Sequence, residues 1–233
     1  MLLASHLLAG LVALACPSNA ATELRLPETV SQAITVEAPT AKTTHASLRT
    51  WRRSGRCWVA AGGPYPARVG WNGLRRDRRE GDGTTPIGSF PIAATMYGNE
   101  PNPGVRFRYT QLRCGDWWVE DPASPAYNTF QRLGCGIRPP FRTPTPDMSK
   151  DRRAYPYLAV VEFNLRPTVP GRGSGIFLHA QTGGPTNGCI RTAQPISSSA
   201  VATTRMTINA WSRVHHPSSR AAGVGRESLM RFG

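Results

Sequence analysis

The chain has 233 residues, of which 39% are hydrophobic and 18% are charged, a balance typical of a globular protein with a buried core. Its net charge of +14 favours anionic partners such as nucleic acid, anionic lipid or the acidic polymers of a cell envelope. No zinc-finger, helix-turn-helix or RNP motif is present in the sequence, so nucleic acid is not the expected partner.

Residues 1–20 have the features of a secretory signal peptide. They contain no Lys, Arg, Asp or Glu, and an apolar run from Leu7 to Ala15 precedes the small-x-small pattern Ser18-Asn19-Ala20. We therefore expect export to the periplasm, the cell wall or the medium. Cys16 leaves a second interpretation, a lipoprotein signal in which that cysteine is acylated and retained. Contact with the membrane is expected only through the signal or this lipid anchor.

Residues 21–48 are rich in Thr, Ala, Glu and Pro without steady periodicity, which predicts a linker. A domain is expected over residues 49–192, followed by an atypical polar segment over 193–233. No long stretch has helical periodicity, so the predicted fold class is mainly β, with short helices and long loops. The expected strands lie within residues 57–60, 67–71, 89–92, 105–110, 157–164 and 175–179.

Cleavage after Ala20 would leave four cysteines. In an oxidising compartment four thiols allow three complete pairings. Cys114 and Cys135 flank a turn-rich segment, so we expect these two to form a disulfide. Cys57 and Cys189 then remain, either free or paired with each other.

The segment 176–192, IFLHAQTGGPTNGCIRT, holds the candidate chemistry. If its two ends form neighbouring strands, the loop between them brings His179 beside Cys189, as a general base beside a nucleophile. Gly188 would leave its own amide and that of Cys189 free to face an oxyanion. Arg191, two residues on, would share the side of Cys189 and stabilise a thiolate or bind a carboxylate. Alternatively, His179 only ends a strand and Cys189 is a small buried residue.

The same segment resembles the active-site segment of the L,D-transpeptidase catalytic domain (YkuD-like) family, in which an apolar strand ends in His and a loop leads to Ser/Thr-His-Gly-Cys. GDGTTPIGSFPI at 81–92 is similar to the Gly-x-x-Thr-Pro-x-Gly-x-Phe signature of that family. DWWVEDPASPAYN at 116–128 resembles the variant found in exported actinobacterial-type members. The resemblance covers roughly residues 50–192 and implies a β-sandwich-like fold.

The resemblance implies a peptidoglycan transpeptidase that needs no metal or organic cofactor. Cys189 would attack the L,D-bond of a tetrapeptide stem, release the terminal D-residue and pass the acyl group to an amine. The acceptor would decide among 3-3 cross-linking, protein anchoring, D-amino-acid exchange and hydrolysis. By the same resemblance His179 matches the base, Thr186 the Ser/Thr, Gly188 the glycine before the cysteine, and Arg191 an arginine frequent in the family.

Two features depart from the family pattern. Asn187 stands where a histidine is usual, and an asparagine can donate a hydrogen bond but cannot carry a proton. After Thr192 the expected amphipathic helix and closing strand are not evident. This predicts that the end of the chain is either divergent and partly disordered or a frameshifted reading.

Three further enzyme or ligand sites are conceivable. Arg56-Cys57-Trp58 is superficially similar to the Cys-Trp of papain-like and NlpC/P60 peptidases, although those cysteines begin a long helix. A metal site could combine His179 and Cys189 with His215 and His216. Trp117 and Trp118 could stack on a sugar or simply pack the loop between the paired cysteines.

The non-enzymatic alternative is a basic, exported module that binds the cell wall without turnover. Its Arg pairs would hold anionic wall polymers, or they are only exposed loop charges. These pairs are Arg75-Arg76, Arg78-Arg79 and Arg152-Arg153.

Overall fold

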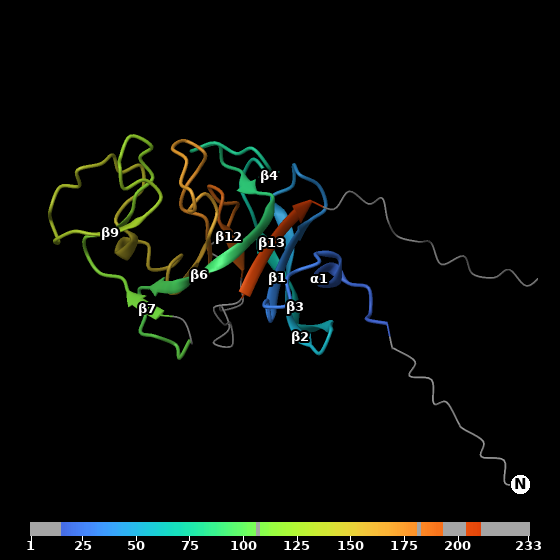
Figure 1. Cartoon of the computed structure of the whole chain (residues 1–233). Coiled ribbons are helices and arrows are strands. Elements are labelled where there is room, and N and C mark those ends of the chain that lie inside the picture. Colours follow the sequence, from blue (N-terminus) through green and yellow to red (C-terminus); the bar gives the residue numbers. More distant parts are fainter. Residues whose placement is uncertain (1–14, 106–107, 181–182, 193–203, 211–233) are drawn as a thin grey trace, which may run out of the picture.

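The structure is a computed structural model that describes residues 15–105, 108–180, 183–192 and 204–210. Strands predominate and helices are few, which confirms the mainly β fold class (Figure 1). The elements are α1 (Ala20–Glu23), β1 (Gln32–Ala38), β2 (His45–Ser54), β3 (Cys57–Arg68), β4 (Leu74–Arg75), β5 (Thr85–Pro86), β6 (Gly88–Gly98), β7 (Arg108–Gln111), β8 (Asp116–Trp118), β9 (Phe130–Arg132), the 3-10 helix η1 (Met148–Lys150), β10 (Leu158–Val161), β11 (Phe177–Ala180), β12 (Ile190–Thr192) and β13 (Thr204–Ala210).

One large sheet dominates the fold. Its strand order is β10-β11-β12-β3-β2-β1-β13-β6-β7, and β10 also pairs with β6. The long strand β6 makes this possible, because it pairs with β13 near its start, through Gly88 to Pro91, and with β10 farther on, through Ile92 to Tyr97. The sheet therefore closes on itself, and its two halves face each other across a shared core.

The main core fills the inside of this closed sheet. Successive side chains of a strand point to opposite faces, so every second residue enters it. Leu178 of β11 and Ile190 of β12 point inward, as do Ile34 of β1 and Met206 of β13. The core therefore draws on strands from both ends of the chain.

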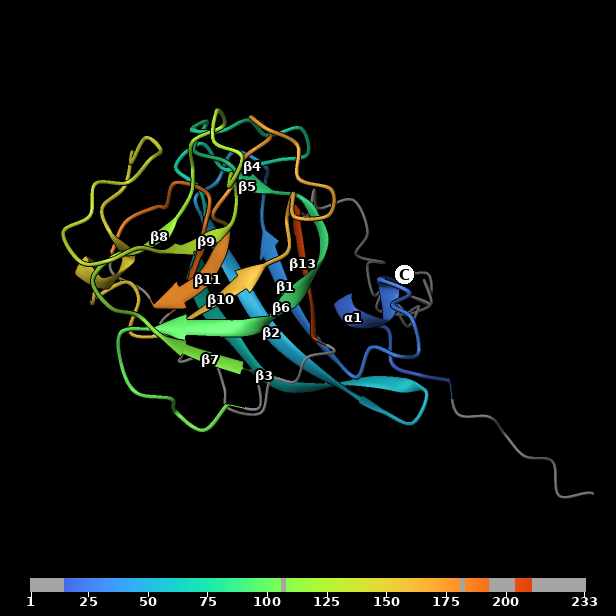
Figure 2. The ribbon, with the colours of Figure 1, turned by 60° about the vertical axis from the view of Figure 1, so that its left-hand side comes forward.

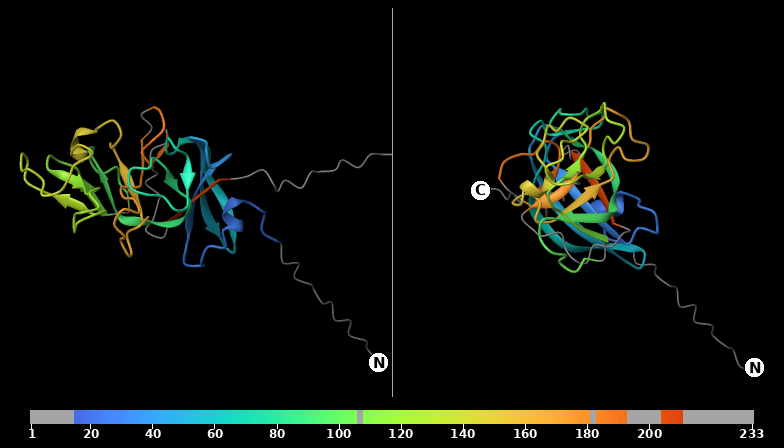
Figure 3. Two further views of the ribbon diagram at one scale, coloured as in Figure 1. Left: turned by 90° about the horizontal axis from the view of Figure 1, so that it is seen from above. Right: turned by 90° about the vertical axis from the view of Figure 1, so that its left-hand side faces the viewer.

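The outer face of β10 and β11 is covered as well. Leu158, Val160 and Phe177 point outward there and pack with Trp118 of β8 and Met148 of η1. The long segment with β8, β9 and η1 lies over this face, at the end of the molecule away from α1 (Figures 2 and 3). The outer face of the two strands is therefore shielded from water, and this is where the site lies.

The structure corrects the predicted linker over residues 21–48. Strand β1 and the start of β2 fall within it, and they are central strands of the large sheet. Thr35 of β1 is buried, but its hydroxyl accepts a hydrogen bond from the indole nitrogen of Trp51 at 3.1 Å. Buried polar groups with such partners are compatible with a core strand, so the polar composition was a poor guide.

The expectation for residues 193–233 is corrected in part. Strand β13 lies in this range, parallel to β1 and antiparallel to β6, and it closes the sheet between them. Met206 and Ile208 point into the main core, and Thr207 donates a hydrogen bond to the Ser89 hydroxyl at 3.1 Å. The end of the chain therefore supplies the closing strand, and a frameshift is not needed to explain it. Residues 193–203 and 211–233 lie outside the described residues.

The start of the described chain is bound to the domain. Cys16 forms a disulfide with Cys57. The Asn19 side chain caps α1 and also donates to the Trp58 carbonyl at 3.1 Å. A sulfur in a disulfide cannot carry a lipid thioether, so the lipid anchor at Cys16 is not compatible with this structure. A signal peptide that ended at residue 20 would also remove Cys16; residues 1–14 lie outside the described residues.

Within the described ranges, no helix is both long and apolar enough to cross a membrane.

Candidate active site

Two neighbouring strands bring His179 and Cys189 together. Strands β11 and β12 pair in parallel with His179 opposite Arg191 and Leu178 opposite Ile190. Cys189 precedes Ile190, so it shares the side of Arg191 and therefore of His179. This is the outer face, where Phe177 also lies and where Cys189 packs against the outward-facing apolar residues of β10 and β11. The strand register thus places the two side chains on one face, with Cys189 two positions before Arg191, the residue opposite His179.

The loop before Cys189 is held by Thr186. The Thr186 hydroxyl donates to the Cys189 carbonyl at 2.7 Å and accepts from the Gly188 amide at 3.0 Å. Gly188 has a φ of +115°, which side chains rarely adopt, and a Cβ there would lie 2.9 Å from the Thr84 carbonyl oxygen. Glycine is therefore required before the cysteine both by the backbone and by the neighbouring chain.

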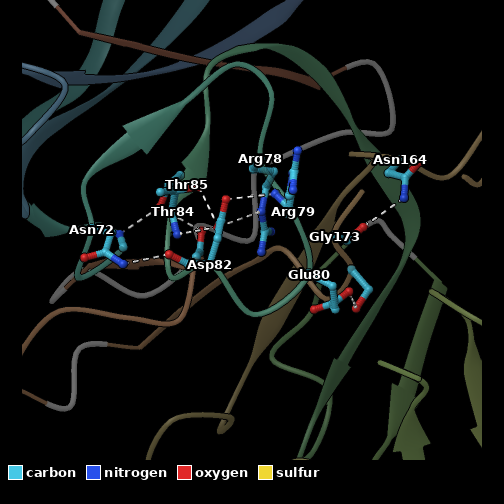
Figure 4. Close-up of polar contacts among 12 residues, drawn as sticks. Asn72, Arg78, Arg79, Glu80, Asp82, Thr84, Thr85, Asn164 and Gly173 are labelled. Atoms are coloured by element: carbon cyan, nitrogen blue, oxygen red, sulfur yellow. Dashed lines mark hydrogen bonds and ion pairs between the residues drawn. The ribbon is translucent and has the colours of Figure 1, made fainter. Parts of the chain in front are cut away.

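The upstream motif at 81–92 braces the same loop. Thr85 is fully buried; its hydroxyl accepts from the Gly70 amide and donates to the Gly188 carbonyl, both at 2.8 Å. The turn before it is fixed by Asp82, which accepts from the Thr84 amide at 2.9 Å and from the Thr84 hydroxyl at 2.7 Å (Figure 4). The two motifs, far apart in sequence, therefore form one structural unit around the cysteine.

One expectation about the oxyanion site is corrected. The Gly188 amide already donates to Thr186, so it is not free to face an oxyanion in this arrangement. Asn187, the residue in place of the usual histidine, is exposed at the tip of the same loop. Its side chain therefore remains accessible to a substrate that approaches this loop.

The thiol and the imidazole are both neutral at rest. Burial raises the pKa of the Cys189 thiol to about 11, and the thiol lies 3.3 Å from the Gly175 carbonyl oxygen, to which it donates. Burial, followed by the charge of Arg191, lowers the pKa of His179 to about 4. The pair is thus a thiol beside an uncharged base, and not a preformed thiolate beside an imidazolium.

Two backbone carbonyls, those of Ala180 and Ala154, interact with the His179 ring. Nδ1 lies 3.1 Å from the Ala180 oxygen, which can only accept, so a proton on Nδ1 satisfies this contact and leaves Nε2 as the basic nitrogen. Tyr155 packs edge-on against the imidazole with ring centroids 5.2 Å apart. The ring thus packs against a half-buried aromatic side chain that the sequence pattern did not indicate.

Arg191 lies where the pattern predicted, on the side of Cys189. Its Nη1 donates to the Gly184 carbonyl at 3.4 Å, and within the described part of the chain its buried Nε has no hydrogen-bond partner. Its charge favours the thiolate of Cys189 but does not outweigh burial. Arg191 therefore has capacity to bind an anionic group at the site.

A pocket of about 430 Å³ lies beside the long segment, and one of its lining residues, Glu120, is close enough to Cys189 for its charge to act on the thiol. Its lining includes Glu80, Glu120 and Asp121. Burial, followed by the charge of Glu80, raises the pKa of Glu120 to about 7, and Glu120 in turn disfavours the thiolate of Cys189. Neither glutamate was among the predicted site residues. Glu80 directly precedes the first motif and Glu120 lies within the DWWVEDPASPAYN stretch, which was the available signal.

The remaining cysteines are structural. Cys114 and Cys135 form the predicted disulfide. Cys57 is paired with Cys16, so it is neither a papain-like nucleophile nor the partner of Cys189. Cys189 is free. Of the four cysteines expected after cleavage, it alone carries a thiol available for chemistry.

The metal-site hypothesis gains no support. Among the residues that the structure describes, no group of three or more His, Cys, Asp or Glu side chains could hold a metal ion. His215 and His216 lie outside those residues.

The two tryptophans do not form a stacking platform. Trp118 is buried against Phe177, with ring centroids 5.1 Å apart, and its indole nitrogen donates to Asn128 at 2.9 Å. Trp117, on the opposite side of β8, is edge-on to Phe141. The pair therefore packs the long loop segment.

The arginine pairs behave unequally. Arg75, Arg76, Arg79, Arg152 and Arg153 are exposed, as expected for loop charges. Arg78, by contrast, is buried, with Nε 3.8 Å from a carboxylate oxygen of Asp82. It belongs to the interior beside Gly188, where Nη1 would lie 3.2 Å from an added Cβ, so it is not part of a surface patch.

Comparison with protein families gives one result. The model of a family described as the L,D-transpeptidase catalytic domain (YkuD) matches residues 32–204, which span the sheet from β1 to the start of β13. Searches of curated proteins and of solved structures returned no match.

Proposed function

The chain belongs to the L,D-transpeptidase catalytic-domain (YkuD) family, and from this premise we propose that it is an active peptidoglycan L,D-transpeptidase with Cys189 as nucleophile and His179 as base. Members of this family are cysteine-dependent transpeptidases that act on peptidoglycan stem peptides. The proposed donor is a tetrapeptide stem, and the proposed acceptor is an amine.

The observation that carries this proposal is the shared face of β11 and β12. Cys189 is a free thiol on that face, and His179 lies on the neighbouring strand with Nε2 as its basic nitrogen. A buried thiol beside a neutral imidazole is the arrangement needed for proton transfer during attack.

The geometry supports the following steps. As Cys189 Sγ attacks the stem carbonyl, His179 Nε2 takes the thiol proton and then gives it to the departing nitrogen of the terminal D-residue. The thioester is the acyl-enzyme. An amine then attacks it, His179 takes a proton from the attacking nitrogen, the new amide forms, and His179 gives that proton to the departing thiolate. Because the resting thiol has a pKa of about 11, attack depends on His179 and not on a standing thiolate population.

Intact mass after incubation with a carbapenem tests the nucleophile. The wild-type domain should gain the mass of the opened β-lactam, Cys189→Ala should gain none, and His179→Gln should react at least 100-fold more slowly, since base catalysis contributes about 10²–10⁴. Both variants should keep the wild-type circular dichroism spectrum. An unmodified, folded wild-type protein would contradict the proposal.

We also propose that the chain works outside the cytoplasm. Two disulfides, Cys16–Cys57 and Cys114–Cys135, suit an oxidising compartment, and a peptidoglycan substrate lies in the envelope. Mass mapping of protein recovered from the periplasm or the medium of an expressing host should find both disulfides and a processed N-terminus upstream of Cys16. A mature chain that begins after residue 20 would contradict the retention of Cys16.

A basic wall-binding module is the second candidate. The exposed arginines named above support attraction to anionic wall polymers, and the high pKa of Cys189 would suit a thiol without turnover. Sedimentation with purified walls at low and high salt measures that attraction. Salt-sensitive binding together with no carbapenem adduct would favour this candidate over the enzyme.

A further inference from the structure

Glu120, which lines the pocket, lies next to the backbone residue that accepts the Cys189 thiol, Gly175. The Gly175 carbonyl accepts the Cys189 thiol at 3.3 Å, and a Cβ added to Gly175 would lie 2.9 Å from Oε1 of Glu120. The Gly175 amide is held by the Asn128 side chain at 3.0 Å, which fixes this short backbone link. Glu120 and the Cys189 thiol are therefore separated by a single backbone residue, and the charge of Glu120 acts on the thiol.

The three carboxylates of the pocket differ in how far they are already engaged. Asp121 accepts two hydrogen bonds from the guanidinium of Arg142, at 3.0 and 3.1 Å. Glu80 accepts from the Tyr127 hydroxyl and from the Ser174 hydroxyl, the latter at 2.7 Å. Glu120 accepts one long hydrogen bond, at 3.3 Å, from Thr145. Glu120 is thus the carboxylate with capacity left for a ligand.

The proposed reaction leaves a proton unassigned. An aliphatic amine arrives as an ammonium ion, and its nitrogen must lose two protons before it becomes an amide nitrogen. One of these passes through His179 to the departing thiolate of Cys189. The other must be removed before attack, because an ammonium nitrogen has no free electron pair. A second base on the acceptor side would meet that need.

We propose that Glu120 is this second base: it binds the ammonium group of the acceptor in the pocket and takes the proton that frees the nitrogen to attack the Cys189 thioester. This inference rests on the proposed transpeptidase function. The bond formed joins the amine nitrogen to the acyl carbon, and the bond broken joins that carbon to Cys189 Sγ. The proton on Glu120 is then released to water. The acceptor is therefore a primary amine that enters as a cation, such as a stem-peptide ammonium or a free amino acid.

The charges around the pocket suit this role. Glu80 adds negative charge that attracts an ammonium group, and with burial it keeps the pKa of Glu120 near neutrality, where a carboxylate can both take and release a proton. Burial raises the pKa of both Glu120 and Cys189, and the buried cation Arg78 partly offsets that rise at each. Its Nε is 3.8 Å from the Asp82 carboxylate, but within the described part of the chain neither Nε nor Nη1 has a hydrogen-bond partner, so both N–H groups can turn toward negative charge that develops at the sulfur.

Single-turnover kinetics with Glu120→Gln separate this role from acylation. The acyl-enzyme is first formed with a synthetic tetrapeptide stem and then mixed with one of two amines: a free D-amino acid, which is protonated at neutral pH, or hydroxylamine, which is largely unprotonated there. Glu120→Gln should acylate at least as fast as wild type, because it loses a charge that disfavours the Cys189 thiolate, and it should react normally with hydroxylamine. Transfer to the D-amino acid at pH 7 should fall at least 100-fold, because a general base contributes about 10²–10⁴.

Two matched variants complete the test. Glu162→Gln removes a carboxylate outside the pocket, one paired with Arg166, and should leave every step unchanged. Glu120→Asp keeps a carboxylate and should restore part of the transfer to the D-amino acid. In wild type, the rate of that transfer should rise with pH and level off above about 7, whereas in Glu120→Gln it should keep rising with the free-amine fraction of the acceptor, with no break near 7.

The results distinguish failure of this inference from failure of the proposed function. An acyl-enzyme that forms normally in Glu120→Gln and reacts with both amines at wild-type rates would overturn the role of Glu120. Equal slowing of acylation and of both transfers would overturn it too, since it would indicate a structural effect. If wild type forms no acyl-enzyme at all, the proposed function itself fails.

Discussion

The two cysteines that sit at strand starts, Cys57 and Cys189, have opposite chemical fates. Cys57 begins β3 on the side of α1, where it is covalently bound to Cys16 beside an apolar cluster that includes Trp51 and Trp58. Cys189 precedes β12 on the side of the long loop segment, where it is a free thiol. Both residues pack beside aromatic side chains, so packing alone does not distinguish them.

What differs is the set of ionisable neighbours. The charges of Glu120, Arg191 and Arg78 act on the pKa of the Cys189 thiol, and Cys189 shares a strand face with His179. The surroundings of Cys57 include the cation of Arg53, 4.6 Å from the centroid of the Trp58 ring, but the Cys57 sulfur is held in a disulfide and has no thiol to respond to it. The comparison teaches that strand position places a cysteine in the fold, whereas the elements that cover its face decide whether it can do chemistry.

The largest effect on stability should come from removing the Cys16–Cys57 disulfide, and it is compared with removal of the Cys189 thiol. The double variant Cys16→Ala/Cys57→Ala should lose about 4 kcal/mol of unfolding free energy, because the disulfide closes a loop with a sequence separation of 41 residues. It should still form the carbapenem adduct under conditions where it is folded. Cys189→Ala should do the reverse. Urea unfolding and intact mass measure the two properties, and loss of both by the same variant would break the distinction.

The next effect concerns the pH dependence that His179 adds to the Cys189 face. Its pKa is about 4 in the folded state, against an ordinary value of 6.5, so the unfolded chain binds the extra proton first as the pH falls. Wild-type stability should therefore decline between pH 6.5 and 4, and His179 should account for about 3 kcal/mol of the decline.

His179→Gln is the control for this pH effect. Urea unfolding of both proteins at several pH values isolates the histidine, because the carboxylates are common to both. The difference in unfolding free energy between the two should shrink as the pH is lowered from 6.5 to 4. A difference that stays constant over this range would show that the folded-state pKa of His179 is not depressed.

The smallest expected effect concerns the support that the upstream motif at 81–92 gives to the loop before Cys189. Thr85→Val keeps the shape of the side chain but leaves the Gly70 amide and the Gly188 carbonyl without their hydroxyl partner. We expect a loss of about 2 kcal/mol in unfolding free energy and slower acylation by a carbapenem. Thr85→Ser retains the hydroxyl and should recover most of both. Equal behaviour of the two variants would contradict the bracing role.

Much of the fold was predictable where strands alternate or are continuously apolar. Segments within β6, β10 and β11 were expected from their composition, and the structure contains them. Strands β1 and β13 were not expected, because Thr35 and Thr207 are polar residues at buried positions. Their hydroxyls are satisfied by Trp51 and Ser89, which lie on other strands. Such compensation is invisible in the local pattern.

The sequence by itself determined the chemical pair of the site, because His179 and Cys189 lie at the ends of one short strand-loop-strand unit and the strand period sets their common side. Only the tertiary structure decided which residues surround that pair. Thr85 reaches Gly188 across a sequence separation of 103 residues, and Glu120 reaches Gly175 from the long loop segment. The same holds for Cys16, which is bonded to Cys57 where the segment around α1 packs against the sheet. These contacts depend on which strands lie side by side in the closed sheet. That spatial order is a property of the whole chain and cannot be read from any local segment.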